Sequence, residues 1–278
     1  SFRLGTYWTT DPDFPTDGWN IADFMALAQK NPDKKLLNTY TPVAVMNLYS
    51  NTVIDSFVDW EKGECSFDSP EFVDILEQIA SLDYSVNGNT NQTVYKEEEE
   101  RRKFLKQEYL LRSESFRSPY DYQKILPQYR DKAFNVGYPS GGEGPWYLMN
   151  AMQQFAIYSN SECKEGAWAF IEFLLSAEEQ NWYGDSYQGF PVRQDAFEAY
   201  LDRPYSNTHN YLGENTGAGA EEIAYMVQQM HRGGSIRSSE LWDIIWEEVP
   251  YLFEGNKSAR EVADLIQSRA RIYLEENR

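Results

Sequence analysis

Aromatic side chains are the residues of this sequence best suited to chemistry with a ligand. The 278 residues include 8 Trp and 20 Tyr, more than the packing of a core requires. Each ring has a flat apolar face and a polar edge, which suits the faces and hydroxyl groups of sugars. Core packing is the competing explanation for any single ring. Those in settings typical of loops or helix starts are Trp19 after Gly18, Trp146 and Tyr147 after a glycine loop, and Trp242 one helical turn before Trp246.

Motifs of nucleophilic, metal and nucleotide chemistry are not found in the sequence. The two histidines, His209 and His231, are too far apart to form a local metal motif. There is no G-x-S-x-G elbow. Residues 141–144 are glycine-rich (GGEG) but lack the Lys-Ser/Thr of a phosphate-binding loop. We therefore predict no metal site and no cofactor.

The carboxylates leave an alternative open. Asp11, Asp13 and Asp17 resemble a calcium loop, but their spacing is not that of an EF-hand and no Glu closes the loop. We interpret them as solvated loop charges. Among 44 Asp+Glu, two could act as general acid and base, as in glycoside hydrolases, although no pair is singled out. The missing catalytic motifs favour a binding protein, and a carbohydrate hydrolase is the alternative.

The charge balance excludes two classes of partner. With 25 Lys+Arg against 44 Asp+Glu, the formal net charge is −19 and the pI is near 4.5. Such a chain repels the phosphates of nucleic acids and of anionic membrane surfaces. Its 41% apolar residues are enough to build a core, so disorder is also excluded.

The ends and the cysteines carry less information. No run of about 20 apolar residues could cross a bilayer, and the sequence starts at Ser1 with neither an initiator Met nor a leader. We expect it to be an excised, truncated piece of a longer protein, so that the missing leader says nothing about export. Cys65 and Cys163 could form one disulfide, but two buried free thiols are the favoured interpretation.

Helices outnumber strands and alternate with them, which predicts an α/β chain. Apolar periodicity and capping residues predict helices within residues 21–28, 71–79, 167–174, 223–230 and 241–252, and a last one after a Ser258–Glu261 capping box. Residues 97–103 (EEEERRK) predict an exposed helix with charges paired at i,i+4. Short apolar runs predict strands at residues 35–38, 108–112, 133–137 and 155–158.

Six blocks, in order and spacing, carry a family resemblance. They are Gly18-Trp19 before a helix, residues 57–69 (FVDWEKGECSFDS), 136–139 (VGYP) before the glycine loop, 164–171 (KEGAWAFI), 189–193 (GFPVR) and 254–258 (EGNKS). Together they resemble the extracellular solute-binding proteins of family 1, the ligand receptors of sugar ABC transporters. The resemblance covers nearly the whole sequence.

This resemblance implies a helix-rich, periplasmic-binding-protein-like (type II) α/β architecture, in which two hinged lobes close over a ligand. Residues 1–138 and 193–278 would form the C-terminal lobe, and residues 139–192 would cross to the N-terminal lobe, whose first part we expect to be missing. The strand at 155–158 would then lack its usual neighbours, and would pack differently or pair with another chain.

The resemblance also implies ligand contacts. By spacing from Gly255, Trp242 resembles the aromatic residue that stacks on sugar in maltodextrin-binding relatives. Residues 112–116 resemble a second ligand loop, and Tyr40 and Thr41 match a third segment. Trp146, Tyr147 and Glu143 are added from the glycine loop. The predicted ligand-binding residues are Tyr40, Thr41, Arg112, Phe116, Glu143, Trp146, Tyr147 and Trp242. Trp60, Trp168 and Trp246 are assigned to packing.

The sequence therefore predicts a non-catalytic receptor for a sugar, favouring an oligosaccharide. Lobe closure on the ligand would present the loaded protein to the permease subunits of an ABC transporter. The family implies an exported protein, either periplasmic or a membrane-tethered lipoprotein at the cell surface. The alternative is a carbohydrate-active hydrolase that uses two carboxylates.

Overall fold

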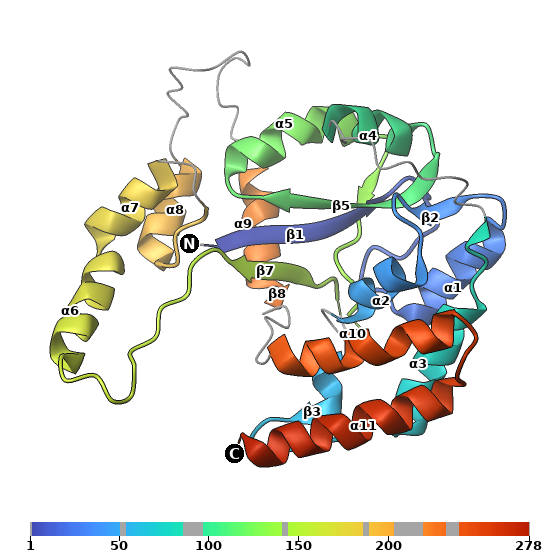
Figure 1. Cartoon of the computed structure of the whole chain (residues 1–278). Coiled ribbons are helices and arrows are strands. Elements are labelled where there is room, and N and C mark those ends of the chain that lie inside the picture. Colours follow the sequence, from blue (N-terminus) through green and yellow to red (C-terminus); the bar gives the residue numbers. More distant parts are fainter. Residues whose placement is uncertain are drawn as a thin grey trace. The chain divides into compact units, whose positions relative to one another are not determined.

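The computed structural model describes residues 2–50, 54–85, 97–140, 144–185, 189–202, 219–231 and 239–277 (Figure 1). The chain forms two compact units. The first unit comprises Ser1–Thr6, Ser113–Lys132 and Trp146–Arg232, and the second unit comprises Tyr7–Arg112, Ala133–Pro145 and Gly233–Arg278. Strands β1 (Phe2–Thr9) and β5 (Tyr109–Phe116) each contribute residues to both units.

The first unit combines a small sheet with helices. Besides parts of β1 and β5, its elements are α5 (Pro119–Tyr129), β7 (Tyr147–Ala151), α6 (Lys164–Leu174), α7 (Ala177–Asp185), α8 (Gln194–Asp202), α9 (Ala220–Gln228) and β8 (Met230–His231). β1 pairs antiparallel with β7, with Leu4 opposite Met149. β7 pairs parallel with β8, with Tyr147 opposite Met230. Helix α7 packs against α6 and α8.

The second unit is larger and richer in helices. Its other elements are α1 (Ile21–Lys30), β2 (Lys35–Leu37), α2 (Pro42–Ser50), a 3-10 turn (Ile54–Phe57), β3 (Val58–Asp59), β4 (Glu64–Cys65), α3 (Pro70–Ser81), α4 (Glu97–Leu105), β6 (Phe134–Asn135), α10 (Ser239–Phe253) and α11 (Ala259–Glu276). β2 pairs parallel with β5, and β1 pairs antiparallel with β6. Helix α11 packs against α10 and α3 (Figure 1).

Local capping explains where several helices begin. Asn20 accepts hydrogen bonds from the backbone N–H groups of Ala22 and Asp23, and Asp23 completes a capping box. Ser69 accepts from the N–H of Phe72 at the start of α3. The predicted Ser258–Glu261 box opens α11. Each such cap satisfies backbone donors that the first helical turn leaves free, which stabilises the helix by about 1 kcal/mol.

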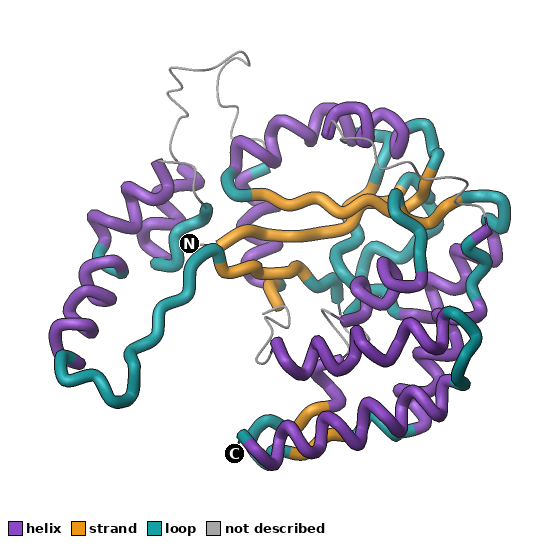
Figure 2. Tube along the Cα trace, in the orientation of Figure 1, coloured by secondary structure: helices purple, strands orange, loops and turns teal. Residues whose placement is uncertain are grey.

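The predicted mixed α/β, helix-rich fold is confirmed, with particular exceptions. Residues 153–158 belong to no strand, so the predicted strand at 155–158 is wrong, and Figure 2 draws this stretch as loop. Phe155 and Tyr158 are largely exposed there, and no described strand pairs with them. Cys65 and Cys163 are both free thiols as predicted, but Cys65 is only half-buried and Cys163 is exposed. The predicted lobe boundaries at 138/139 and 192/193 stay a prediction.

The charged helix α4 is less exposed than its sequence predicts. Glu100 and Arg101 are buried, as is Phe104, which packs its ring 5.7 Å from that of Tyr109. The Tyr109 hydroxyl donates to the Glu100 carbonyl oxygen at 3.0 Å. Lys103 pairs with Glu100 at i,i+3, with Nζ 2.8 Å from Oε1. One face of α4 is therefore core, and Lys103 reaches Glu100 on that face.

Candidate functional site

The predicted ligand-binding residues are divided between the two units. Tyr40, Thr41, Arg112 and Trp242 belong to the second unit, and Phe116, Trp146 and Tyr147 belong to the first. Glu143 lies outside the described residues. Each unit is therefore considered separately.

Among the predicted positions in the second unit, Trp242 has the most exposed aromatic ring, and it lies beside the ring of Trp246. Their ring centroids are 6.2 Å apart and their planes are inclined by 21°. Both rings are only partly buried. Residues four apart share a helix face, and the two near-parallel indoles stack there into one aromatic surface, which we call the Trp242–Trp246 platform. Such a platform can stack on the apolar face of a sugar ring.

An ion-pair network fixes α10 to α11 behind this platform. The buried Glu248 carboxylate accepts from Arg269 Nη1 at 2.7 Å, and Lys257 Nζ lies 3.5 Å from its other oxygen. Arg269 also bridges to Glu247, and these two hydrogen bonds, the one to Glu247 first, raise the pKa of its guanidinium. Lys257 Nζ lies 4.2 Å from the centre of the Tyr251 ring. The network holds the helix that carries both tryptophans.

Tyr40 and Thr41 lie at the start of α2. Only 3% of Tyr40 is exposed, and its ring centroid is 4.9 Å from that of Tyr84. Burial, with a smaller effect of the Asp83 carboxylate, raises the pKa of Tyr40 to about 12. Thr41 accepts a hydrogen bond from the N–H of Ala44 at 3.2 Å. In this conformation Tyr40 packs in the core, and Thr41 caps the helix.

Arg112, a predicted ligand-binding residue, is buried on β5 in the second unit. Its Nη1 donates to the hydroxyl oxygen of Tyr109 at 3.0 Å, and that hydroxyl donates onward to the Glu100 carbonyl. A buried guanidinium needs such partners, since an unpaired charge in the interior is costly. The relay orients Arg112 from within the protein.

Phe116 and Tyr147 belong to aromatic packing in the first unit. The Phe116 ring meets Tyr122 edge to face at 5.1 Å, and the Tyr147 ring meets Tyr225 edge to face at 6.3 Å. Burial is the main cause that raises the pKa of both Tyr122 and Tyr147, and the Glu222 carboxylate and then Tyr147 add to the shift of Tyr122. Tyr225 is 46% exposed, so the packing reaches the surface there. Trp146 is partly buried.

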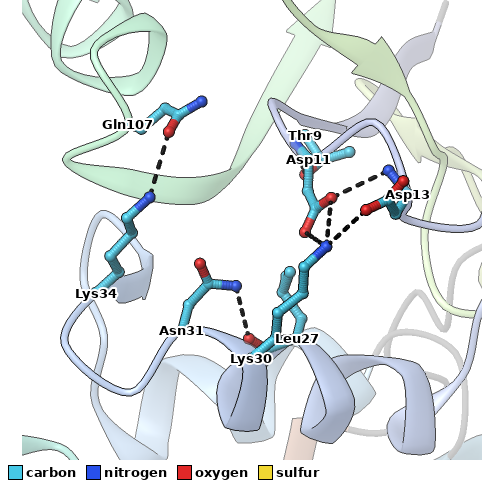
Figure 3. Close-up of polar contacts among 8 residues, drawn as sticks. All are labelled: Thr9, Asp11, Asp13, Leu27, Lys30, Asn31, Lys34 and Gln107. Atoms are coloured by element: carbon cyan, nitrogen blue, oxygen red, sulfur yellow. Dashed lines mark hydrogen bonds and ion pairs between the residues drawn. The ribbon is translucent and has the colours of Figure 1, made fainter.

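Lys30 forms ion pairs with two carboxylates of the acidic loop before α1. Lys30 Nζ lies 3.0 Å from a carboxylate oxygen of Asp11 and 3.0 Å from one of Asp13 (Figure 3). The two hydrogen bonds to these carboxylates, that to Asp13 first, raise the pKa of Lys30. Across the part of the chain that the structure describes, no cluster of three His, Cys, Asp or Glu residues could hold a metal ion. The Lys30 ammonium group fastens the loop to the end of α1.

Trp19 serves packing rather than ligand contact. It is 1% exposed, and its Nε1 donates to the Gly137 carbonyl oxygen at 3.2 Å. The N–H of Ser140 donates to the Trp19 carbonyl at 2.8 Å. These bonds fasten the turn before α1 to residues 137–140. The core explanation is therefore correct for this ring.

The packing assignments made for three other tryptophans have mixed outcomes. Trp168 is 52% exposed in the described structure, so its assignment to packing is wrong. Trp60 and Trp246 are half-buried. Sequence reasoning therefore missed Trp246 as the second half of the platform. The i,i+4 spacing from Trp242 was the signal that could have identified it.

Comparison with known proteins defines the fold. No family model matches the chain, and no curated protein does. Solved structures match nearly the whole length of this chain. The sugar-binding protein MalE from Xanthomonas citri has a TM-score of 0.61 and 10% identity, over 99% of this chain and 70% of that one. The chain therefore has a periplasmic-binding-protein-like fold.

Two further structures with this periplasmic-binding-protein-like fold bind other carbohydrates. A chitin oligosaccharide binding protein has a TM-score of 0.58 and 13% identity, over 100% of this chain and 71% of that one. An ABC substrate-binding protein from Listeria monocytogenes, in complex with cycloalternan, has a TM-score of 0.57 and 14% identity, over 99% and 70%. The predicted resemblance in fold is confirmed. In the described residues, no helix has both the length and the apolar character needed to cross a membrane.

Proposed function

We propose that the protein is the ligand-binding component of an ABC importer for a sugar or oligosaccharide. The observation that carries the proposal is the likeness of nearly the whole chain to proteins that bind sugars or oligosaccharides. The Trp242–Trp246 platform supports it, because stacked, partly exposed indoles suit the apolar faces of sugar rings.

The proposed contacts have different roles. Trp242 and Trp246 supply apolar contact. Arg112 and Glu143 exchange hydrogen bonds with sugar hydroxyls. Four of the proposed contacts are buried in the described conformation, so their proposed part requires a change in exposure: Tyr40, Arg112, Phe116 and Tyr147. Thr41 and Trp146 complete the set of proposed ligand-binding residues.

Delivery to a transporter is part of the same proposal. In it, residues 1–138 and 193–278 belong to one lobe and residues 139–192 cross to the other. The closed state that the ligand favours is the one that permease subunits recognise. We place the protein outside the cytoplasmic membrane, in the periplasm or tethered at the cell surface. The net charge of −19 favours solubility there.

Binding is tested by thermal shift and calorimetry with maltose, chitin oligosaccharides and tagatose, sugars named for neighbours of this fold. We expect a saturable shift with at least one of them. Trp242→Ala should weaken binding at least about tenfold, equivalent to ~1.4 kcal/mol. The matched control is Trp168→Ala, which removes an equally large exposed indole from the first unit and should leave the affinity unchanged.

A second assay distinguishes the proposed receptor from the alternative, a carbohydrate hydrolase. The protein is incubated with the same oligosaccharides, and new reducing ends are counted. A receptor leaves the number unchanged. Turnover that a single Asp or Glu substitution abolishes would show an enzyme and contradict the proposal.

A further inference from the structure

Three tyrosines of the second unit lie together beside α2 and α3, and we call them the tyrosine cluster. Tyr40 precedes α2, Tyr49 lies in the last turn of that helix, and Tyr84 follows α3. Helices α2 and α3 pack against each other. The ring centroids of Tyr40 and Tyr84 are 4.9 Å apart, and the ring planes are inclined by 44°. The two rings are therefore in direct contact.

Tyr84 is the outermost ring of the tyrosine cluster. It is partly exposed, whereas Tyr40 and Tyr49 are 3% and 1% exposed. The Tyr84 hydroxyl donates to the Ile79 carbonyl oxygen at 2.8 Å. Ile79 lies in the last turn of α3, whose carbonyl groups lack acceptor roles within the helix. A single side-chain hydrogen bond therefore helps to hold the Tyr84 ring over Tyr40.

Tyr49 has a buried hydroxyl group without a hydrogen-bond partner. In the part of the chain that the structure describes, no donor or acceptor reaches this oxygen. Burial raises the pKa of Tyr49, and Tyr84 is the next cause, so the two side chains are close enough to interact. Buried hydroxyl groups without a partner are rare and costly. A ligand hydroxyl group in the place of Tyr84 would supply the partner.

We propose that Tyr84 is the displaceable cover of a sugar subsite formed by Tyr40 and Tyr49. The inference rests on the proposed function and adds two residues, Tyr49 and Tyr84, that no sequence pattern selected. A sugar ring has both features that the subsite needs. Its apolar face can replace the Tyr84 ring on Tyr40, and its hydroxyl groups can bond to the Tyr49 hydroxyl. The exchange also explains how the buried Tyr40 meets a ligand.

The cover lowers the affinity of the subsite, because it competes with the sugar. Only molecules in which Tyr84 has moved away can bind, so the observed Kd is the intrinsic Kd divided by the fraction of open molecules. The hydrogen bond to Ile79 and the ring contact with Tyr40 both favour the covered state. Weakening either should raise the affinity, whereas the loss of an ordinary ligand contact lowers it.

Calorimetry with maltose and chitin oligosaccharides, sugars named for neighbours of this fold, tests the cover through Tyr84→Phe. This variant keeps the ring and removes the hydrogen bond to Ile79. Because one such bond changes an equilibrium by about 2- to 10-fold, we expect binding to be tighter by about that factor. The matched control is Ser81→Ala, which removes another hydroxyl group that donates near the end of α3, to the Gln78 carbonyl at 2.8 Å. It should leave the Kd unchanged.

Tyr49→Phe tests the opposite side of the subsite. We expect it to weaken sugar binding several-fold, because the ligand loses a hydrogen bond. The urea midpoint of the free protein should not fall, since the Tyr49 hydroxyl has no partner to lose in the described residues. A lower midpoint would show that the hydroxyl serves the fold and not the ligand.

Acetylation by N-acetylimidazole, which modifies accessible tyrosines, tests the cover without any sugar. Peptide mass spectrometry measures the rate at Tyr40, and Tyr251, which is 44% exposed, is the reference. We expect Tyr40 to react several-fold faster in Tyr84→Phe than in the unmodified protein, while the rate at Tyr251 stays the same. Equal rates at Tyr40 would show that Tyr84 does not cover it.

The outcomes separate this inference from the proposed function. If the unmodified protein binds sugar and Tyr84→Phe binds it equally or more weakly, the receptor function stands and the cover is refuted. If no variant binds any of the sugars, the proposed function is refuted together with the subsite, whatever the acetylation rate at Tyr40. Tighter binding by Tyr84→Phe with faster acetylation of Tyr40 supports both.

Discussion

The indole rings of Trp242 and Trp246 lie nearly parallel on one face of α10, with their centroids 6.2 Å apart. Together the two indoles present more aromatic surface to a ligand than either ring alone. Under the proposed function, the pair would favour a chain of sugars over a single ring. Under the same proposal, Trp246 would contribute to the binding of longer sugars and less to that of a monosaccharide.

We expect Trp246→Ala to weaken the binding of a trisaccharide more than that of the corresponding monosaccharide. Loss of one aromatic contact corresponds to about 0.5–1.5 kcal/mol, which is up to roughly tenfold in Kd. Calorimetry with sugars of increasing length measures the difference, and Trp182→Ala in the first unit is the control. An equal loss for both sugars would contradict the idea of an extended platform.

The ion pairs of Arg269 should differ in their contribution to stability. The Glu248 side chain is 11% exposed and that of Glu247 is 62% exposed, although both bind the same guanidinium. We expect Glu248→Gln to lower the free energy of unfolding by about 1–3 kcal/mol, because a charge-assisted bond in a poorly solvated site is lost. Glu247→Gln should cost less than about 1 kcal/mol. Urea unfolding compares the two variants, and equal losses would refute the assignment.

Capped, periodic helices could be predicted from the sequence, because the residues that start them lie within one turn of each other. Ser258 is an example, and its predicted capping box forms. The burial of Glu100 could not be predicted in the same way. It depends on Tyr109, which lies beyond the helix and takes the Glu100 carbonyl as its acceptor, and composition alone indicates a solvated helix.

The candidate site shows the same limit. Trp242 could be selected by its spacing from Gly255, because both belong to one helix and its terminal turn, and its contact with a ligand stays a prediction. The packing of Tyr40 on Tyr84 joins segments more than 40 positions apart, and no local pattern reports it. The strand expected at 155–158 failed for a related reason. A strand needs a partner, and the described residues provide none there.

Gly18 should tolerate alanine worse than another glycine with positive φ. Its φ is +115°, and an added Cβ would lie 2.6 Å from the Gly144 carbonyl oxygen. Gly255 has φ +73° with nothing within 4 Å of an added Cβ. We expect Gly255→Ala to cost about 1 kcal/mol from backbone strain alone, and Gly18→Ala to cost about 1–3 kcal/mol more, because a backbone must move. Similar midpoints in urea would contradict this reasoning.

The capping box of α11 should make stability depend on pH through Glu261. Its carboxylate accepts from the Ser258 N–H and from the Ser258 hydroxyl, both at 2.8 Å. These bonds, the backbone one first, hold the pKa of Glu261 below its ordinary value of 4.5. A folded pKa below the unfolded one means that the stabilisation is full above pH 4.5 and is lost as the pH falls through the folded pKa.

Glu261→Gln should therefore flatten the acid limb of the stability profile. We expect the free energy of unfolding of the unmodified protein to fall more steeply between about pH 5 and pH 3 than that of the variant, with the two curves converging at the acid end. Glu276→Gln, an exposed position on the same helix, is the control and should follow the unmodified protein. Parallel curves for Glu261→Gln and the unmodified protein would show that the carboxylate does not couple α11 to pH.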